Sequence, residues 1–165
     1  MKWRNHKMVT FGLVYTTTGG FLAAFAAMFG AVLPDVLEFR GVVPHRTITH
    51  YAWLWFGLCL FFWAGIKSSP DNSVLFYSLF FMSAGALLHV LQDALSLGGV
   101  PFITPDGPRH GFGIYKTNTL SEEVTSWGLM VIFVALASWR GLLAEEYLSR
   151  QFAIVLELFR GIVHV

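Results

Sequence analysis

Twenty-six consecutive residues, Met8 to Leu33, include neither a charged residue nor a histidine. A helix needs roughly 20 such residues to span a hydrocarbon core about 30 Å thick, so this run is long enough to cross a bilayer. Only 13% of all residues are charged, against about 25% in soluble domains, and the net charge is +1. The sequence therefore predicts an integral membrane protein. It excludes a disordered chain, a basic nucleic-acid-binding protein and, with one cysteine, a disulfide scaffold.

Three further apolar segments cover residues 51–66, 74–88 and 124–139, and each reaches spanning length only with its flanks. Residues 145–165 differ, because polar residues recur there every three or four positions, as in an amphipathic helix. We expect a single all-α domain that forms a polytopic membrane helix bundle, with the metal site within residues 1–144. The amphipathic helix over residues 145–165 is expected to lie on the membrane surface. Binding of a protein partner or of a second copy is the alternative role of the C-terminal helix.

The first apolar run allows two arrangements. As one helix it would be about 39 Å long at 1.5 Å per residue, longer than the hydrocarbon core. Its middle, Thr16 to Gly20, is a poor helix interior, so two short helices over roughly residues 5–16 and 20–33 fit equally well. We favour this hairpin, because it places His6 and Asp35 on the same membrane face.

Ionisable residues gather where the apolar segments begin or end. His89 and Asp93 are four residues apart, so a helix presents both on one face. This spacing suits two ligands of one cation, although a hydrogen bond between helices would use the same pair. Asp35 ends the first run, and His45 and His50 precede the second segment, where ordinary interfacial residues also occur.

Four short motifs follow one another in the chain. They comprise an N-terminal histidine, Leu-Pro-Asp, His-Arg-x-x-Thr-His and His-x-x-x-Asp with a glycine and a proline beyond. Their order and spacing resemble those of the YdjM-type membrane-bound metal-dependent hydrolases of prokaryotes. The resemblance spans roughly residues 6–105, and the matching residues are His6, Leu33, Pro34, Asp35, His45, Arg46, Thr49, His50, His89, Asp93, Ser96 (threonine in the family), Gly99 and Pro105.

The chain departs from the family pattern within these motifs. Leu37 stands where the family has a second aspartate, and Glu38, with its longer side chain, follows one residue later. Thr47 and Tyr51 replace a glycine and a serine. Loss of a carboxylate would change the number of metal ions or weaken one site.

The resemblance implies a metal-dependent hydrolase of the prokaryotic inner membrane. Histidine and carboxylate ligands suit a divalent metal, zinc first and manganese or iron as alternatives. A site at the membrane face favours a lipidic or membrane-proximal ester or phosphoester. Glu38 is the expected proton acceptor, and Arg46 and Arg109 are expected to bind an anionic group of the substrate, Arg46 with a catalytic role. The expected metal ligands are His6, Asp35, His45, His50, His89 and Asp93.

Two other functions fit the same residues. One is a non-enzymatic membrane protein in which a structural metal or polar cluster supports a complex, and the other is a carrier of cations or protons. The carrier is disfavoured, because no continuous polar path crosses the apolar segments. In the hairpin arrangement seven basic residues lie on the site face and four on the other, which predicts a cytoplasmic site. The seven are Lys2, Arg4, Lys7, Arg40, Arg46, Arg109 and Lys116.

Overall fold

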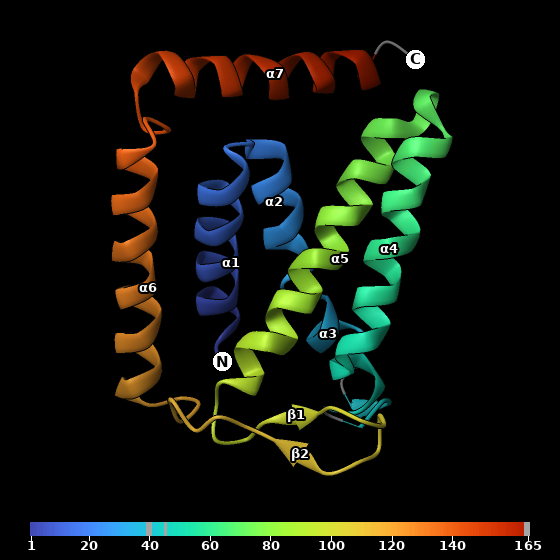
Figure 1. Ribbon diagram of the computed structural model, residues 1–165, viewed down its shortest axis with the longest axis vertical. Coiled ribbons are helices and arrows are strands. Elements are labelled where there is room, and N and C mark those ends of the chain that lie inside the picture. The colour runs from blue at the N-terminus through green and yellow to red at the C-terminus, as the bar shows by residue number, and fades with distance from the viewer. Residues whose placement is uncertain (39–40, 45, 164–165) are drawn as a thin grey trace.

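The computed structural model describes residues 1–38, 41–44 and 46–163, and its main elements are helices (Figure 1). Neighbouring helices pack in the order α4, α5, α2, α1, α6, and α7 crosses one end of this row. The bounds are α1 (Trp3–Thr18), α2 (Phe21–Gly30), α3 (Leu33–Val36), η2 (Ile48–His50), α4 (Ala52–Ser68), η3 (Pro70–Asn72), α5 (Ser73–Ala94), β1 (Val100–Pro101), β2 (Arg109–His110), α6 (Leu120–Trp139) and α7 (Glu145–Val163). The two short strands pair antiparallel at the end opposite α7.

The N-terminal apolar run folds as a hairpin, which confirms the two-helix arrangement. Gly19 ends α1 at φ +73°, a left-handed conformation that glycine adopts without steric cost, and its N–H donates to the Tyr15 carbonyl. Gly20 then starts α2 in extended backbone. The rings of Tyr15 and Phe21 stack across the turn with centroids 5.1 Å apart. The hairpin thereby returns the chain to the end of the bundle where His6 lies.

Two helices are long and apolar enough to cross a membrane, Pro70–Ala94 and Leu120–Trp139. The three spans expected after the hairpin are not supported among the described residues, because α4 has only 17 residues. Its expected N-terminal extension is not α-helical: Ile48–His50 forms a 3₁₀ turn, and Tyr51 is extended. The indole N–H of Trp55 donates to the Thr49 carbonyl at 2.8 Å, which fixes this turn against the start of α4.

The backbones of α2 and α5 approach each other closely where the two helices cross. A Cβ added at Gly30 would lie 1.9 Å from the Met82 carbonyl oxygen, and one added at Gly85 would lie 1.9 Å from the Ala27 carbonyl oxygen. Ala23, Ala24 and Ala27 of α2 are fully buried. Small residues allow two helix backbones to approach this closely. The crossing therefore determines where the C-terminal half of α5 lies relative to the N-terminal hairpin.

Glu122 connects the first turn of α6 to the first turn of α1. Its carboxylate accepts hydrogen bonds from the backbone N–H of Lys2 at 2.7 Å, the side-chain amide of Asn5 at 2.6 Å and the backbone N–H of Asn118 at 2.8 Å. The residue is fully buried. From the sequence, Glu122 is expected only to cap its own helix. In the structure it also satisfies a donor at the N-terminus of α1 and holds that helix in place.

We expect Glu122→Ala to lower the free energy of unfolding by about 1–3 kcal/mol, because it leaves buried donors without an acceptor. Thermal unfolding in detergent, followed by circular dichroism, would measure the loss. The neighbouring Glu123 pairs with the exposed side chains of Lys2 and Arg4, so Glu123→Ala is a matched control with a smaller expected loss. Equal losses in the two variants would contradict this role of Glu122.

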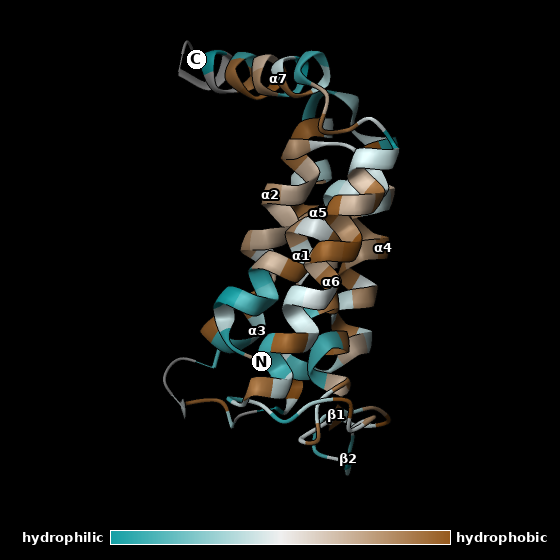
Figure 2. Ribbon diagram, turned by 90° about the vertical axis from the view of Figure 1, so that its left-hand side faces the viewer, coloured by the Kyte–Doolittle hydropathy of each residue, from teal (hydrophilic) through white to brown (hydrophobic). Residues whose placement is uncertain are grey.

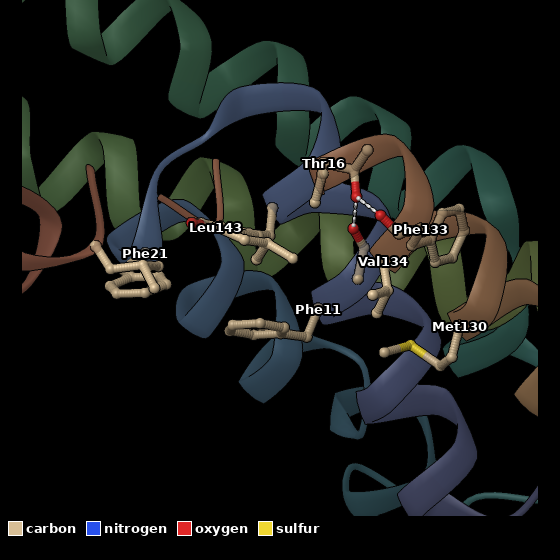
Figure 3. A pocket seen from close by; sticks show the side chains of 11 residues that line it. Phe11, Thr16, Phe21, Met130, Phe133, Val134 and Leu143 are labelled. Carbon is tan, nitrogen blue, oxygen red and sulfur yellow. Dashed lines mark hydrogen bonds between the residues drawn. The ribbon is translucent and has the colours of Figure 1, made fainter. Parts of the chain in front are cut away.

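The amphipathic segment forms α7, which lies across the ends of α1 and α2 (Figure 1). Tyr147 donates to the Gly19 carbonyl at 2.9 Å, and Phe152 packs against Phe21. Beside it lies a cavity of about 280 Å³ between α1, α2 and α6 (Figure 3). Thr16 contributes a hydroxyl to this cavity, but the hydroxyl donates to backbone carbonyls. The described residues that line this cavity are uncharged, so it lacks the groups that acid–base or metal chemistry needs.

Candidate metal centre

Hydrophilic residues gather at the end of the bundle that holds the N-terminus and α3 (Figure 2). Five ionisable side chains from four elements meet there. His6 belongs to α1, Asp35 to α3, His50 to η2, and His89 and Asp93 to α5. The three histidines are fully buried, and the Asp93 side chain is 3% exposed. We call these five residues the His/Asp cluster.

The cluster contains two groups of three whose ligand atoms lie within 4.8 Å of one another. One group is His6, His89 and Asp93, and the other is Asp35, His50 and His89. His89 is common to both. A single imidazole nitrogen binds one ion at a time, so the two groups cannot use His89 for two ions at once.

The distances around His50 and His89 are those of a coordination site. Their Nε2 atoms are 3.2 Å apart, and Asp35 Oδ1 lies 3.3 Å from the first and 3.6 Å from the second. Asp93 Oδ2 lies 3.6 Å from His50 Nε2 and 3.9 Å from His89 Nε2. A tetrahedral zinc ion with bonds of about 2.0–2.1 Å separates its ligand atoms by about 3.4 Å. The Asp35, His50 and His89 atoms are therefore spaced as three ligands of one such ion would be, whereas Asp93 falls in the other group of three.

The outer nitrogens of two histidines are held by acceptors. His89 Nδ1 donates to the Ala31 carbonyl at 2.7 Å, and His6 Nδ1 donates to Gln92 Oε1 at 3.1 Å. Gln92 is itself oriented, because its amide nitrogen donates to the Thr10 hydroxyl at 2.9 Å. In the neutral imidazole this leaves the lone pair on Nε2, which is the nitrogen that points into the cluster.

His50 is oriented in the same way by Glu38. His50 Nδ1 lies 3.2 Å from Glu38 Oε1, the oxygen that also accepts the backbone N–H of Arg46 at 3.1 Å. A carboxylate favours the tautomer with the proton on Nδ1. His50 Nδ1 also lies 3.2 Å from the Thr49 hydroxyl, and the Nε2 atoms of His50 and His89, 3.2 Å apart, share a hydrogen bond when one of them is protonated. With both protons on Nδ1, the two Nε2 atoms instead face each other as lone pairs. Such an arrangement is repulsive unless a cation lies between the two nitrogens.

Two buried atoms of the cluster support the same conclusion. His6 Nε2 and Asp35 Oδ1 have no hydrogen-bond partner within the described part of the chain. Buried polar atoms without partners cost free energy, and a metal ion would satisfy both nitrogen and oxygen. The nitrogen and oxygen ligand set fits zinc, and also manganese or iron.

The protonation states outside the spanning helices suit metal binding. Burial lowers the pKa of His50, so its imidazole is neutral near pH 7. Burial acts to raise the pKa of Asp35, but the neighbouring His50 and His89 outweigh it and hold this pKa well below its usual range. A neutral imidazole and an ionised carboxylate are the forms that bind metal.

Cations of the protein also contact the cluster. Arg46 Nη2 lies 2.9 Å from Asp93 Oδ2, and the amino group of Met1 lies 2.9 Å from Asp93 Oδ1. Trp3 donates its indole N–H to Asp35 Oδ2 at 2.7 Å. Asp93 is thus partly neutralised by cations of the protein, whereas Oδ1 of Asp35 lies against His50 and His89.

The structure brings together five of the six residues expected to bind metal. The sixth, His45, lies outside the described residues. Glu38 lies behind His50 rather than among the facing ligand atoms, and Leu37 is 36% exposed. Arg46 contacts Asp93, while Arg109 is exposed on β2 and lines a neighbouring cavity with Arg46.

The residues that orient the cluster are not apparent from the sequence motifs. Gln92 and Thr10 hold His6, and Trp3 holds Asp35. One signal was available: Thr10 follows His6 by four residues, and Gln92 precedes Asp93 in an otherwise apolar helix. Both patterns indicate polar positions in the helix interior, but neither indicates a partner.

No family model, curated protein or solved structure matches this chain.

Proposed function

We propose that the protein is a membrane-embedded, metal-dependent hydrolase. The observation that carries this proposal is the pair of Nε2 atoms of His50 and His89, which face each other at 3.2 Å beside Asp35 and Asp93. Their outer nitrogens are held by Glu38 and the Ala31 carbonyl. Pre-oriented imidazoles of this kind are typical of metal sites, where outer partners fix the ligands.

The membrane part of the proposal rests on α5 and α6, which are long and apolar enough to cross a bilayer. Large apolar side chains also point outward from them, such as Leu75 at 57% exposure and Val131 at 67%. In water such side chains would be unfavourable, whereas lipid solvates them. We propose the prokaryotic inner membrane, with the cluster at the cytoplasmic end, α7 at the opposite surface, and the shorter helices α1, α2 and α4 packed beside the two spans.

Histidines 6, 50 and 89 with Asp35 and Asp93 would hold the metal. When bound, a divalent metal supplies a coordinated water whose pKa falls toward about 7. Glu38 Oε1 lies 3.2 Å from His50 Nδ1, where its charge favours the proton on Nδ1, and Glu38 is the proposed proton acceptor. Arg46 contacts Asp93 and is the proposed partner of a substrate anion, together with Arg109. The proposed substrate is a lipidic or membrane-proximal ester or phosphoester.

Metal analysis of the purified protein, combined with a hydrolysis assay, tests this proposal. We expect a divalent transition metal to co-purify, chelation to abolish cleavage of a chromogenic phosphodiester, and the metal to restore it. Protein without metal, or hydrolysis that chelation leaves unchanged, would overturn the proposal.

One observation favours a non-enzymatic alternative. Arg46 and the Met1 amino group already neutralise Asp93, as in a polar cluster that joins helices. Leu37 also replaces a carboxylate of the family pattern. This alternative predicts that chelation lowers the unfolding temperature while no ester is cleaved at any metal concentration.

A further inference from the structure

A second polar feature lies directly beside the cluster. A cavity of about 460 Å³ is open at the surface near β2 and shares Arg46 with the cluster. Among the described residues, its wall includes three cationic side chains and no acidic one. The residues that line it are Arg46, Leu97, Gly98, Arg109, Lys116 and Thr117.

Arg46 forms the inner wall of this cavity. Its Nη2 donates to Asp93 at 2.9 Å, and its Nη1 donates to the Gly99 carbonyl at 3.0 Å. A Cβ added at Gly98 would lie 2.2 Å from Nη1, so the guanidinium can lie here only against a residue without a side chain. Arg46 is 8% exposed, and its buried Nε has no hydrogen-bond partner among the described residues. The two hydrogen bonds therefore fix the guanidinium, and its positive charge, at the inner wall of the cavity.

The charge of the wall indicates which anion fits. A phosphate monoester carries about −1.5 to −2 charges near pH 7 and three acceptor oxygens. Guanidinium groups bind phosphate through paired hydrogen bonds, and a lysine adds a point charge. We propose that this cavity binds the phosphate group of the substrate, with Lys116 as a binding residue. This proposal rests on the proposed hydrolase function.

The surface around the cavity indicates the source of that phosphate. Leu97 is 65% exposed, Ile103 and Phe112 are each 76% exposed, and Ile114 is 57% exposed. These residues lie in the segment that carries β1 and β2 and contributes Arg109 to the cavity wall. Apolar side chains beside basic ones are typical of surfaces that bind anionic lipid headgroups. The favoured source of the bound phosphate is therefore a lipid headgroup at the membrane surface. A soluble phosphoester would bind the same cationic side chains.

Isothermal titration of the purified protein with inorganic phosphate tests the site. We expect Lys116→Gln to weaken phosphate binding roughly tenfold while the metal content stays unchanged. Lys67→Gln is the matched control, because Lys67 lies at the far end of α4 and should leave binding unchanged. Equal phosphate affinity in the parent protein and in Lys116→Gln would overturn the inference.

The metal content separates this inference from the proposed function. Phosphate binding that depends on Lys116, in protein without metal, would support the cavity and overturn the hydrolase. Bound metal in a protein that does not bind phosphate would support the metal site of the proposed hydrolase and overturn the proposal for the cavity.

Competition for bound phosphate distinguishes the two sources. Displacement by phosphatidic acid in mixed micelles, with phosphatidylcholine micelles as control, would assign a lipid headgroup. Displacement by glycerol phosphate alone would assign a soluble ester, and displacement by neither would overturn the proposal.

Discussion

Replacement of His89 by alanine is expected to remove the bound metal and to reduce hydrolysis by roughly 100-fold or more. His89 belongs to both groups of three ligands, so its loss disrupts whichever group holds the ion. Loss of an outer-shell partner alone costs about 10–100-fold in metal affinity, and loss of a ligand should cost at least as much. Metal per chain, measured by plasma mass spectrometry, is the direct measurement.

His110→Ala provides a matched control for this prediction. His110 is exposed on β2, outside the cluster, and its removal should leave metal content and hydrolysis unchanged. Membrane insertion and the thermal unfolding of metal-free protein should be compared in both variants. A His89→Ala protein that keeps its metal would contradict the assignment. If the parent protein contains no metal and His89→Ala fails to insert into the membrane, the two results together would instead support a structural polar cluster.

The largest expected effect on stability is that of Gly85→Ala. The added Cβ would lie 1.9 Å from the Ala27 carbonyl oxygen, far inside van der Waals contact, and both atoms belong to helix backbones. Only separation of α2 and α5 could relieve this overlap. We expect a loss of about 3 kcal/mol or more in the free energy of unfolding, at the upper end of overpacking effects. Thermal unfolding in detergent would measure it.

Gly57→Ala is the control for backbone propensity. Gly57 also lies inside an apolar helix, but a Cβ added there meets nothing within 4 Å. Because alanine is a better helix former than glycine, this substitution should be neutral or stabilising by up to about 1 kcal/mol. Similar destabilisation at both positions would show that the α2–α5 crossing is not the cause. Because the crossing positions His89, Gly85→Ala should also reduce metal content.

Local signals in the sequence were sufficient for the helical class, and they allowed the hairpin as one of two arrangements; the hairpin was favoured because it brings His6 and Asp35 to one face. The run from Thr16 to Gly20 predicts the break between α1 and α2, because glycine and β-branched residues are poor in a helix interior. The same reasoning failed for α4. Its extension through Ile48 was expected from apolar character alone, whereas His50 is drawn into a buried cluster and Thr49 accepts a bond from Trp55. Tertiary contacts therefore shortened the helix.

The sequence by itself determined which residue types could form a metal site, because ionisable residues in so apolar a chain need protein, water or metal around them. The spacing of His89 and Asp93 also fixed that these two share a face. Only the tertiary structure decided that His50 Nε2 meets His89 Nε2, that Glu38 lies behind His50, and that Arg46 separates the cluster from a basic cavity. Those contacts join elements far apart in the chain, and they depend on how closely the helices pack, which no local pattern encodes.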